Sequence, residues 1–462
     1  MYDDTIAAIA TPLGEGGLAV VRLSGPQALA IADKSFVPAG AASLKPSAAT
    51  THTIQYGHIV RSGQRVDEVL AAVLRAPRTY TREDTVEISC HGGLLPAKLV
   101  LDTLLEHGAR TAEPGEFTRR AFLNGRLDLA QAEAVADLIH SRTELALLAA
   151  NEQLAGKLSG RINALRDEMV RTLAHVEAHI DFPDEDIAPD TRDELIARLE
   201  RGVAFMEELL RTAREGQLLR RGIRGAIIGR PNAGKSSLLN QLLGHDRAIV
   251  SPVPGTTRDT IEETANVRGL PVVFIDTAGL REAQDAIEIE GIRRSRESLA
   301  RAEFVLHVLD ASEPLTRADE AYLAEFADKH RILVLNKVDR PRRLQWPGEG
   351  AGKLPEAQGI VEVCCADGQG IEALKDAIKA LAWAGGIKAE MWQVMINSRH
   401  QEALGRARQG TQRTVAVLRA GETLELAAAE MRAAVNAVGE IVGKTTTEDL
   451  LDSIFSQFCL GK

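Results

Sequence analysis

The hydrophobic and polar positions of the chain form three successive patterns, the first of which covers residues 1 to about 120. Short apolar runs such as 18–23 (LAVVRL) and 69–74 (VLAAVL) alternate there with clusters of Gly, Pro and Thr. Runs of this length separated by turn-forming residues are typical of mixed helices and strands. The first pattern therefore predicts a compact domain with its own core.

The second pattern is helical. From Leu154 to Ile180, apolar residues recur at steps of three or four, which predicts one long helix with a single apolar stripe. Pro183 should end that helix, because proline cannot continue the hydrogen-bond ladder. A second helical stretch is predicted from about 191 to 219, and two long helices in tandem favour an antiparallel pair.

The third pattern alternates strands and helices between residue 222 and about 385. Such alternation favours a parallel sheet covered by helices on both faces. Helical periodicity then resumes to the end of the chain. Periodicity leaves open whether the two helical flanks pack together around an inserted domain or form separate units. The predicted buried strands lie in AIIG, VVFIDTAG, FVLHVLD and RILVLNKVD.

Length supports a multidomain chain, since 462 residues exceed what one hydrophobic core usually organises. We predict α/β and all-α parts in a single chain. The bounds are 1–122 for an N-terminal α+β domain, 123–220 for the first part of a helical domain, 221–386 for an inserted α/β domain and 387–462 for the second helical part.

Composition excludes several classes of protein. The chain is 45% hydrophobic and 26% charged, with a net charge of -10, which argues against coating nucleic acid by bulk electrostatics. Its start is acidic where a signal peptide is basic, and no apolar run approaches the roughly 18 residues that span a bilayer. The four cysteines lack metal-ligand spacing. These features predict a cytoplasmic chain with reduced thiols.

The strongest chemical signal is GRPNAGKS at residues 229–236, between the predicted strand AIIG and the apolar helix SLLNQLL. This context confirms the phosphate-loop pattern. Backbone amides at the helix start bind phosphate oxygens, Lys235 reaches the terminal phosphates, and Ser236 offers a hydroxyl to magnesium. The predicted nucleotide contacts in this loop are Asn232, Ala233, Gly234, Lys235, Ser236 and Ser237.

Two further motifs follow in the order expected of a GTPase. DTAG at 276–279 places the Asp276 carboxylate near magnesium and the Gly279 amide near the γ-phosphate. NKVD at 336–339 places Asp339 to accept two hydrogen bonds from guanine, a polar contact that rejects adenine. The order of the motifs argues against an ATPase. The remaining predicted base contacts are Asn336, Lys337, Cys365 and Ala366, the last two standing where such enzymes usually have Ser-Ala.

PGTTRD, residues 254–259, lies between the first two motifs and is predicted to be a mobile switch. Thr257 would join the magnesium shell with Ser236 and Asp276, and Thr256 would lie beside the phosphates. Leu280, however, stands where Ras-like enzymes carry the glutamine that positions water. The motifs alone do not say which residue aims the water.

Several segments together resemble the MnmE (TrmE) family of tRNA modification GTPases over the whole chain. They are GRPNAGKSSLLN, PGTTRD, DTAGLRE, FPDED, TAEPGEFTRRAFLNGRLDLAQAEAVADLI and the terminal FCLGK. The resemblance implies a tetrahydrofolate-binding-like N-terminal domain that also makes the constitutive dimer contact. It further implies a helical domain and an inserted Ras-like P-loop GTPase domain with a mainly parallel sheet.

For catalysis, the resemblance implies that a potassium ion replaces the arginine finger. The ion would be held by Asn232, with backbone oxygens of Ser251, Val253 and Thr256 completing its shell. Glu288 would orient the water, so that Leu280 is no defect. The implied catalytic residues are Glu288, Lys235, Thr257 and Gly279.

For the modification itself, the resemblance implies a homodimer acting with the FAD-dependent protein MnmG (GidA) on carbon 5 of the wobble uridine, position 34, of certain tRNAs. The one-carbon donor would be 5,10-methylene- or 5-formyl-tetrahydrofolate. The implied folate contacts are Arg22, Glu87, Arg126 and Lys462. The FCLGK tail would reach this site, with Cys459 in contact and not a nucleophile.

Two other functions stay open from the sequence. One is a regulatory ribosome-assembly GTPase without one-carbon chemistry, which should carry a basic RNA-binding module that this acidic chain lacks. The other is a nucleotide-sensing scaffold, which potassium should not stimulate. Arg119, Arg120 and the stretch 399–413 are candidate tRNA contacts, although charged helix faces are usually only solvated.

Overall fold

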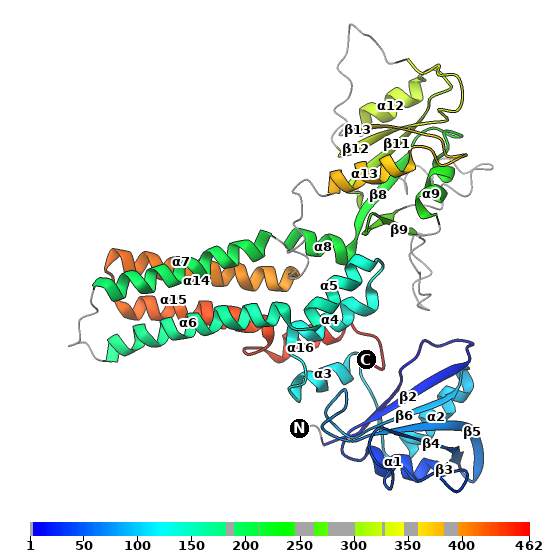
Figure 1. The fold of residues 1–462 in the computed structure, drawn as a ribbon, viewed down its shortest axis with the longest axis vertical. Coiled ribbons are helices and arrows are strands. Elements are labelled where there is room, and N and C mark those ends of the chain that lie inside the picture. The colour runs from blue at the N-terminus through cyan, green and yellow to red at the C-terminus, as the bar shows by residue number, and fades with distance from the viewer. Residues whose placement is uncertain are drawn as a thin grey trace. The chain divides into compact units, whose positions relative to one another are not determined.

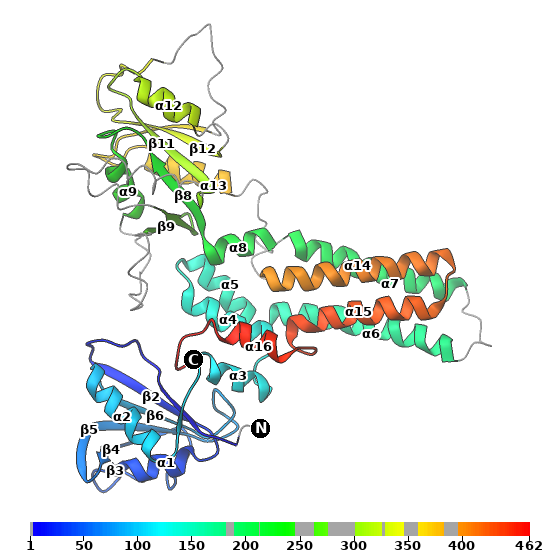
Figure 2. The ribbon, with the colours of Figure 1, turned by 180° about the vertical axis from the view of Figure 1, so that it is seen from behind.

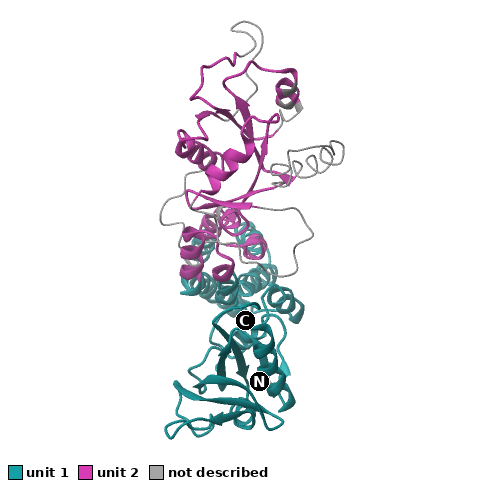
Figure 3. Ribbon diagram, turned by 90° about the vertical axis from the view of Figure 1, so that its right-hand side faces the viewer, with its two compact units in different colours: residues 1–136, 154–202, 406–462 teal, residues 137–153, 203–405 magenta. Residues whose placement is uncertain are grey.

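The computed structural model describes residues 3–181, 189–211, 213–244, 263–275, 301–325, 329–345, 359–382 and 396–462. The chain forms two compact units, each built from separate segments (Figure 3). Unit 1 contains residues 1–136, 154–202 and 406–462, and unit 2 contains 137–153 and 203–405.

The N-terminal part of unit 1 is a seven-stranded sheet in the order β3-β4-β5-β6-β2-β1-β7. Neighbouring strands are antiparallel except for the parallel pair β1 and β7. Both predicted runs lie in strands, 18–23 in β2 and 69–74 in β5. The strands are β1 Ile6–Ile9, β2 Leu18–Ser24, β3 Phe36–Pro38, β4 Thr53–Arg61, β5 Gln64–Leu74, β6 Thr85–His91 and β7 Arg110–Thr111.

Helices α1 (Ala28–Ser35) and α2 (Leu94–Glu106) cover one face of this sheet (Figure 1). Alternate strand residues point to that face and are buried against the helices, as the two-residue period of a strand requires. The strand residues that alternate with these buried ones, including Arg22 on β2, point to the opposite face of the sheet. The buried set includes Ala19, Val21, Leu23, Val69, Ala71, Val86, Ile88 and Cys90.

The two helical flanks pack together, which settles the question that periodicity left open. Helices α6 (Lys157–Asp181) and α7 (Pro189–Arg211) precede the inserted domain, whereas α14 (Ser398–Ala420) and α15 (Leu424–Val442) follow it. Figure 1 shows α6 beside α15 and α7 beside α14. Ion pairs join the helices in unit 1, namely Glu177 with Arg432, Glu200 with Arg419 and Arg406 with Glu440.

The predicted helix bounds need two corrections. Leu154 does not begin the long helix but ends α5 (Glu144–Leu154), because Gly156 takes a left-handed φ of 86° and turns the chain. The stretch predicted as one helix from 191 to 219 contains α7 and a separate α8 (Ala213–Arg221). Pro183 lies outside the described residues.

The shorter helices of unit 1 bring the C-terminus back to the N-terminal half of the chain. They are α3 (Glu116–Leu123), α4 (Leu129–His140), which belongs to unit 1 up to residue 136, and α16 (Glu448–Phe455). Helix α16 packs against α3 (Figure 2). Its apolar face shares a buried cluster with α4, which includes Leu129, Ala132, Leu451, Ile454, Phe455 and Phe458.

Unit 2 contains the predicted mainly parallel sheet, in the order β13-β12-β11-β8-β10-β9. Every neighbouring pair is parallel except β9 with β10, an antiparallel edge that the sequence patterns did not predict. The strands are β8 Ile223–Ile228, β9 Glu263–Val267, β10 Leu270–Phe274, β11 Phe304–Asp310, β12 Arg331–Asn336 and β13 Gly359–Val363.

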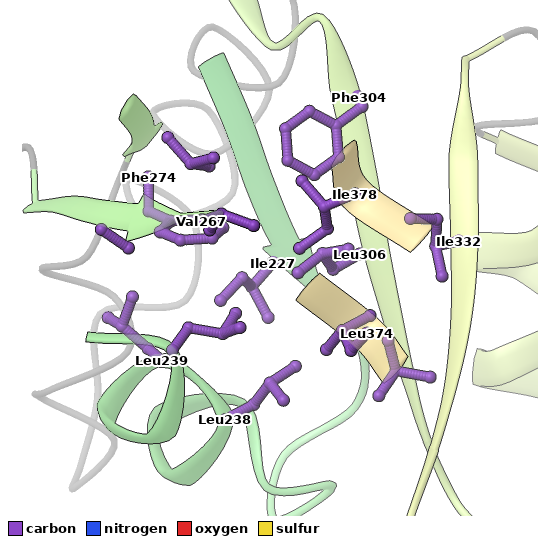
Figure 4. Packing of buried hydrophobic residues seen from close by; sticks show 14 of the residues in the cluster. Ile227, Leu238, Leu239, Val267, Phe274, Phe304, Leu306, Ile332, Leu374 and Ile378 are labelled. Carbon is purple, nitrogen blue, oxygen red and sulfur yellow. The ribbon is translucent and has the colours of Figure 1, made fainter. Parts of the chain in front are cut away.

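Helices α9 (Lys235–Leu243), α12 (Arg317–Glu325) and α13 (Ile371–Ala382) belong to the same unit. Apolar side chains of α9 and α13, among them Leu238 and Leu374, pack onto the central strands, where they share one buried cluster with Phe304 of β11 (Figure 4). Because β8 is central and buried, the loop that leaves its carboxyl end has a fixed starting point. None of the helices in the described parts of the chain combines the length and apolar character needed to cross a bilayer.

Candidate functional site

The predicted phosphate loop joins β8 to α9 at the carboxyl end of the parallel strands. Asn232 has a left-handed φ of 64° and Gly234 a φ of 102°. These angles fold the loop over the first turn of α9, and the amides and dipole at a helix N-terminus favour anions. Lys235 Nζ donates to the carbonyls of Gly229 and Arg230 at 2.8 and 2.9 Å. Burial lowers the pKa of this lysine.

The NKVD motif begins at Asn336, the last residue of β12, and binds the phosphate loop directly. Asn336 is buried, and its Nδ2 donates to the Ala233 carbonyl at 2.9 Å. Lys337 Nζ donates to the Asn232 carbonyl, also at 2.9 Å. A Cβ on Gly234 would lie 2.0 Å from Asn336 Nδ2, so this position has no room for a side chain. The two predicted motifs therefore form one site.

The loop after β13 completes the part of the site that is predicted to bind the guanine base. Asn336 Oδ1 accepts a hydrogen bond from the Cys365 amide at 3.2 Å. The exposed Asp339 is approached by the Cys364 thiol, with Sγ 3.4 Å from Oδ1. The sequence prediction named Cys365 and Ala366 and missed Cys364. No sequence pattern placed the Cys364 thiol beside the aspartate, because the two residues lie in loops after different strands.

Ser236 and Ser237 are exposed in the first turn of α9, so the Ser236 hydroxyl is a suitable oxygen donor for a hard cation such as magnesium. Another residue that sequence reasoning missed is Asp310, which pairs with Lys337. The remaining predicted residues of the site lie outside the described residues. They are Ser251, Val253, Thr256, Thr257, Asp276, Gly279 and Glu288.

A second group of predicted residues meets in unit 1, on the face of the N-terminal sheet away from α1 and α2. Arg22 and Glu87 are directly opposite in the β2–β6 register, and Arg22 Nε lies 2.8 Å from Glu87 Oε1. The Arg22 guanidinium lies 5.8 Å from the centre of the Tyr80 ring, and that of Arg126 lies 4.9 Å from it. We call Arg22, Tyr80, Glu87 and Arg126 the polar cluster. Tyr80 was not predicted.

The C-terminal tail, residues 456–462, reaches the polar cluster. Arg22 Nη1 donates to the Gly461 carbonyl at 3.2 Å, and the Phe117 amide donates to the Lys462 carbonyl at 3.2 Å. Gly461 has a φ of 87°, and a Cβ there would lie 2.6 Å from the Ile9 carbonyl oxygen. All four predicted folate residues thus converge. Cys459 is exposed.

Arg120, proposed from sequence as a tRNA contact, is fully buried, and that prediction is wrong. Its guanidinium pairs with Asp4, Glu83 and Glu116. Its neighbour Arg119 pairs with Asp452 on α16. The sequence showed two adjacent arginines on a helix but not that Asp4 and Glu83, from two distant segments, join Glu116 of the same helix around one of them.

A phosphate loop between a parallel strand and a helix, bound to an Asn-Lys-x-Asp loop, defines a P-loop GTP-binding protein. Comparison with known proteins gives the family. Residues 5–126 match the model of the GTP-binding protein TrmE N-terminus, and residues 129–459 match that of the MnmE helical domain.

The tRNA modification GTPases MnmE of Geobacillus kaustophilus and Listeria innocua are each 47% identical to this chain. The match covers 99% of both chains for the first and 100% for the second. The chain belongs to this family and is a GTP hydrolase of tRNA modification. The solved G domain of T. maritima FeoB is 24% identical over 35% of this chain and 98% of its own, with a TM-score of 0.25, too low to support an argument.

Proposed function

We propose that this GTPase is activated by potassium and modifies carbon 5 of the wobble uridine, position 34, of certain tRNAs. It would act as a homodimer with an FAD-dependent flavoprotein of the MnmG (GidA) type and a tetrahydrofolate one-carbon donor. The observation that carries the folate part is the meeting of Arg22, Glu87, Arg126 and the Lys462 tail at one place in unit 1.

Asn232 is the residue of this chain assigned to potassium. It is exposed, and its left-handed backbone is held by the hydrogen bond from Lys337 to its carbonyl. A neutral amide oxygen is a suitable ligand for a monovalent cation. An arginine finger contributes a factor of about 10³ to 10⁵ to hydrolysis, roughly 4 to 7 kcal/mol of barrier. A cation fixed beside the phosphates would supply comparable positive charge. Backbone oxygens of Ser251, Val253 and Thr256 are assigned to complete its shell.

The other roles at the nucleotide follow from residue chemistry. Lys235 would bind the terminal phosphates once they compete with the loop carbonyls for its ammonium group. Asp339 would read guanine beside the Cys364 thiol, and the Cys365 amide would hold the Asn336 side chain. Magnesium, when bound, neutralises developing phosphate charge, and Ser236, Thr257 and Asp276 are assigned to hold it. Glu288 is assigned to orient water, and the Gly279 amide to contact the γ-phosphate.

The donor set of the polar cluster and of the C-terminal tail fits a folate. Glu87 offers a carboxylate that can pair with the amino-pyrimidine edge of a pterin, and Arg126 and Lys462 offer cations to the glutamyl tail. The side chains of Arg22 and Glu87 keep 17% and 30% of their surface exposed, so a ligand can reach them. The derivative proposed is 5,10-methylene- or 5-formyl-tetrahydrofolate. Redox chemistry would belong to the flavin of the partner.

The potassium part is tested by GTP turnover in potassium and in sodium buffer, with Asn232→Ala beside the wild type. We expect potassium to accelerate turnover at least about tenfold, a small share of the arginine-finger range, and the variant to lose this gain. Asn240→Ala, the same change at an exposed position of α9, is the matched control. Equal rates in the two buffers would contradict the potassium mechanism.

The folate part is tested by equilibrium binding of 5-formyl-tetrahydrofolate to the wild type and to Arg126→Ala. We expect the variant to bind at least about tenfold more weakly, as loss of a charge-assisted contact predicts. Arg171→Ala on α6, whose side chain is 70% exposed, is the control and should bind normally. Absence of folate binding together with potassium-independent turnover would favour the ribosome-assembly alternative.

A further inference from the structure

Asp310 is a buried carboxylate at the carboxyl end of β11, outside the motifs recognised in the sequence. It is only 3% exposed. Its Oδ1 accepts hydrogen bonds from the Ser312 amide at 2.9 Å and the Ser312 hydroxyl at 2.6 Å. Its Oδ2 lies 2.6 Å from Lys337 Nζ. Both carboxylate oxygens are therefore engaged, and the group has a defined orientation.

The ionised form of this carboxylate is favoured. Burial raises the pKa of Asp310, but hydrogen bonds from Lys337 and Ser312 outweigh burial and leave the pKa below its ordinary value. A buried charge persists when it is paired and hydrogen-bonded, as this one is. Asp310 thus supplies a fixed negative charge beside the nucleotide site at neutral pH.

Lys337 connects that charge to the phosphate loop. The same ammonium group that pairs with Asp310 donates to the Asn232 carbonyl at 2.9 Å. The strand register explains the geometry, because Asp310 on β11 lies opposite Asn336 on β12. Lys337 therefore lies beside Asp310 at the carboxyl ends of the parallel strands, where the phosphate loop also begins.

We propose that Asp310 is a positioning residue for GTP binding and hydrolysis. It holds the Lys337 ammonium in place, and through it the Asn232 end of the phosphate loop. The nucleotide-binding part rests on the GTPase activity of the family. The proposal also predicts an effect on potassium binding, and that prediction rests on the proposed function, in which Asn232 is the potassium ligand.

Two physical effects give Asp310 this role. Without its carboxylate, the long Lys337 side chain loses a charged partner and regains rotamer freedom, so that Asn232 is no longer held in its left-handed conformation. The ammonium charge would also be left unbalanced beside the cation that Asn232 binds. Like charges at short range oppose each other most where water is excluded. Both effects weaken nucleotide and potassium binding.

The alternative role for Asp310 is a purely structural one, and an experiment has to distinguish it from the positioning role. Its bonds to Ser312 form a turn after β11, so the residue stabilises the fold locally whether or not Lys337 is present. A structural role would lower nucleotide affinity independently of Lys337. A positioning role would lower affinity only while Lys337 is there to be positioned.

A double-mutant cycle makes this distinction. We would measure the affinity of a fluorescent GDP in sodium buffer for the wild type, Asp310→Asn, Lys337→Met and the double variant. We expect Asp310→Asn to bind about tenfold more weakly, as loss of a charged hydrogen bond predicts. We expect no additional loss when Asp310→Asn is added to Lys337→Met. Glu362→Gln on β13 of the same sheet removes an exposed ion pair with Arg342; this variant is the control and should bind normally.

The potassium part has its own measurement, the potassium concentration that half-activates GTP turnover. Asp310→Asn should raise it about tenfold, as the like-charge effect predicts, and Glu362→Gln should not. If the wild type is not activated by potassium, the potassium mechanism fails, yet the sodium cycle still decides the role of Asp310. Additive losses in that cycle, or an unchanged affinity in Asp310→Asn, would overturn the proposal.

Ser312→Ala keeps the test decisive if Asp310→Asn does not fold. It removes the hydroxyl bond to Oδ1 and keeps the carboxylate charge. We expect GDP affinity to fall about two- to threefold, in line with a weak neutral contact, and the loss to vanish in the Lys337→Met background. A loss of equal size in both backgrounds would show that the turn after β11, and not Lys337, carries the effect.

Discussion

Replacing Arg120 by methionine should destabilise the N-terminal half of unit 1 through electrostatics. Arg120 is 0% exposed, and its Nη2 lies 2.7 Å from Asp4 Oδ1 and 2.9 Å from Glu116 Oε1. Its Nη1 also donates to the Asp4 carbonyl at 3.0 Å. Methionine preserves much of the volume but removes every one of these bonds. Glu116, only 4% exposed, would keep Arg110 as its remaining cation.

The expected loss follows from the burial of Glu116. Removing one member of a buried ion pair typically costs about 3 to 5 kcal/mol, because the other charge stays buried without its partner. Arg110 still pairs with Glu116, so we expect a value near the lower end, about 3 kcal/mol. Arg119→Met removes an ion pair to Asp452, whose side chain is 61% exposed. That change should cost less than about 1 kcal/mol.

Hydrogen exchange of the full-length protein measures this loss locally. About 3 kcal/mol corresponds to roughly a hundredfold faster exchange of the α3 amides, whereas Arg119→Met should give much less. Adding Glu116→Gln to Arg120→Met should recover part of the protection, because the stranded charge is then gone. Equal effects of the two arginine substitutions, or additive losses in the double variant, would refute the electrostatic explanation.

Two further predictions concern unit 2. Gly234→Ala would place a Cβ 2.0 Å from Asn336 Nδ2 at a φ of 102°, so binding of fluorescent GTP should weaken at least about tenfold, as backbone strain predicts. The control is Gly160→Ala, which has nothing within 4 Å of its Cβ and should bind GTP normally. Equal GTP affinity of the two variants would contradict the steric explanation. Burial, with the charge of Arg331, lowers the pKa of His307 from 6.5 to about 4. The unfolded chain then takes up a proton more readily as pH falls from 6.5 toward 4, so acid destabilises the fold, by up to about 3 kcal/mol. Thermal melts of His307→Gln at pH 7.5 and 4.5 should show a smaller acid-induced drop than the wild type, and an equal drop would argue against His307 as the source.

Much of the nucleotide site was predictable because its chemistry is local. A phosphate loop needs only a strand, a glycine-rich turn and the first turn of a helix, all contiguous in sequence. The order of the later motifs predicted that Asn336 and Lys337 would join it, and the structure brings them there. Alternation likewise identified β8, β10, β11 and β12 of unit 2, because strands buried on both faces read as continuous apolar runs. It did not identify the parallel strand β13, in which buried and exposed residues alternate.

Residues that act through distant partners escaped the sequence patterns. Asp310 looks like any acidic residue after a strand, and Tyr80 like any aromatic residue in a loop. The Cys364 thiol was not considered, because the predicted base contacts were Cys365 and Ala366 and no sequence pattern brings the preceding cysteine to Asp339. Arg120 was interpreted as a candidate surface charge, because the sequence does not show that Asp4 and Glu83 join Glu116 around it.

By itself, the sequence determined the family, the phosphate loop and the periodicity of the helices and strands, since each depends on residues close together in the chain. Only the tertiary structure decided that the two helical flanks pack together, that Arg120 is buried and that the Gly461 carbonyl bonds to Arg22 across 439 residues. These contacts depend on strand order and on which helix faces meet. Periodicity says which face of an element is buried but not which partner covers it.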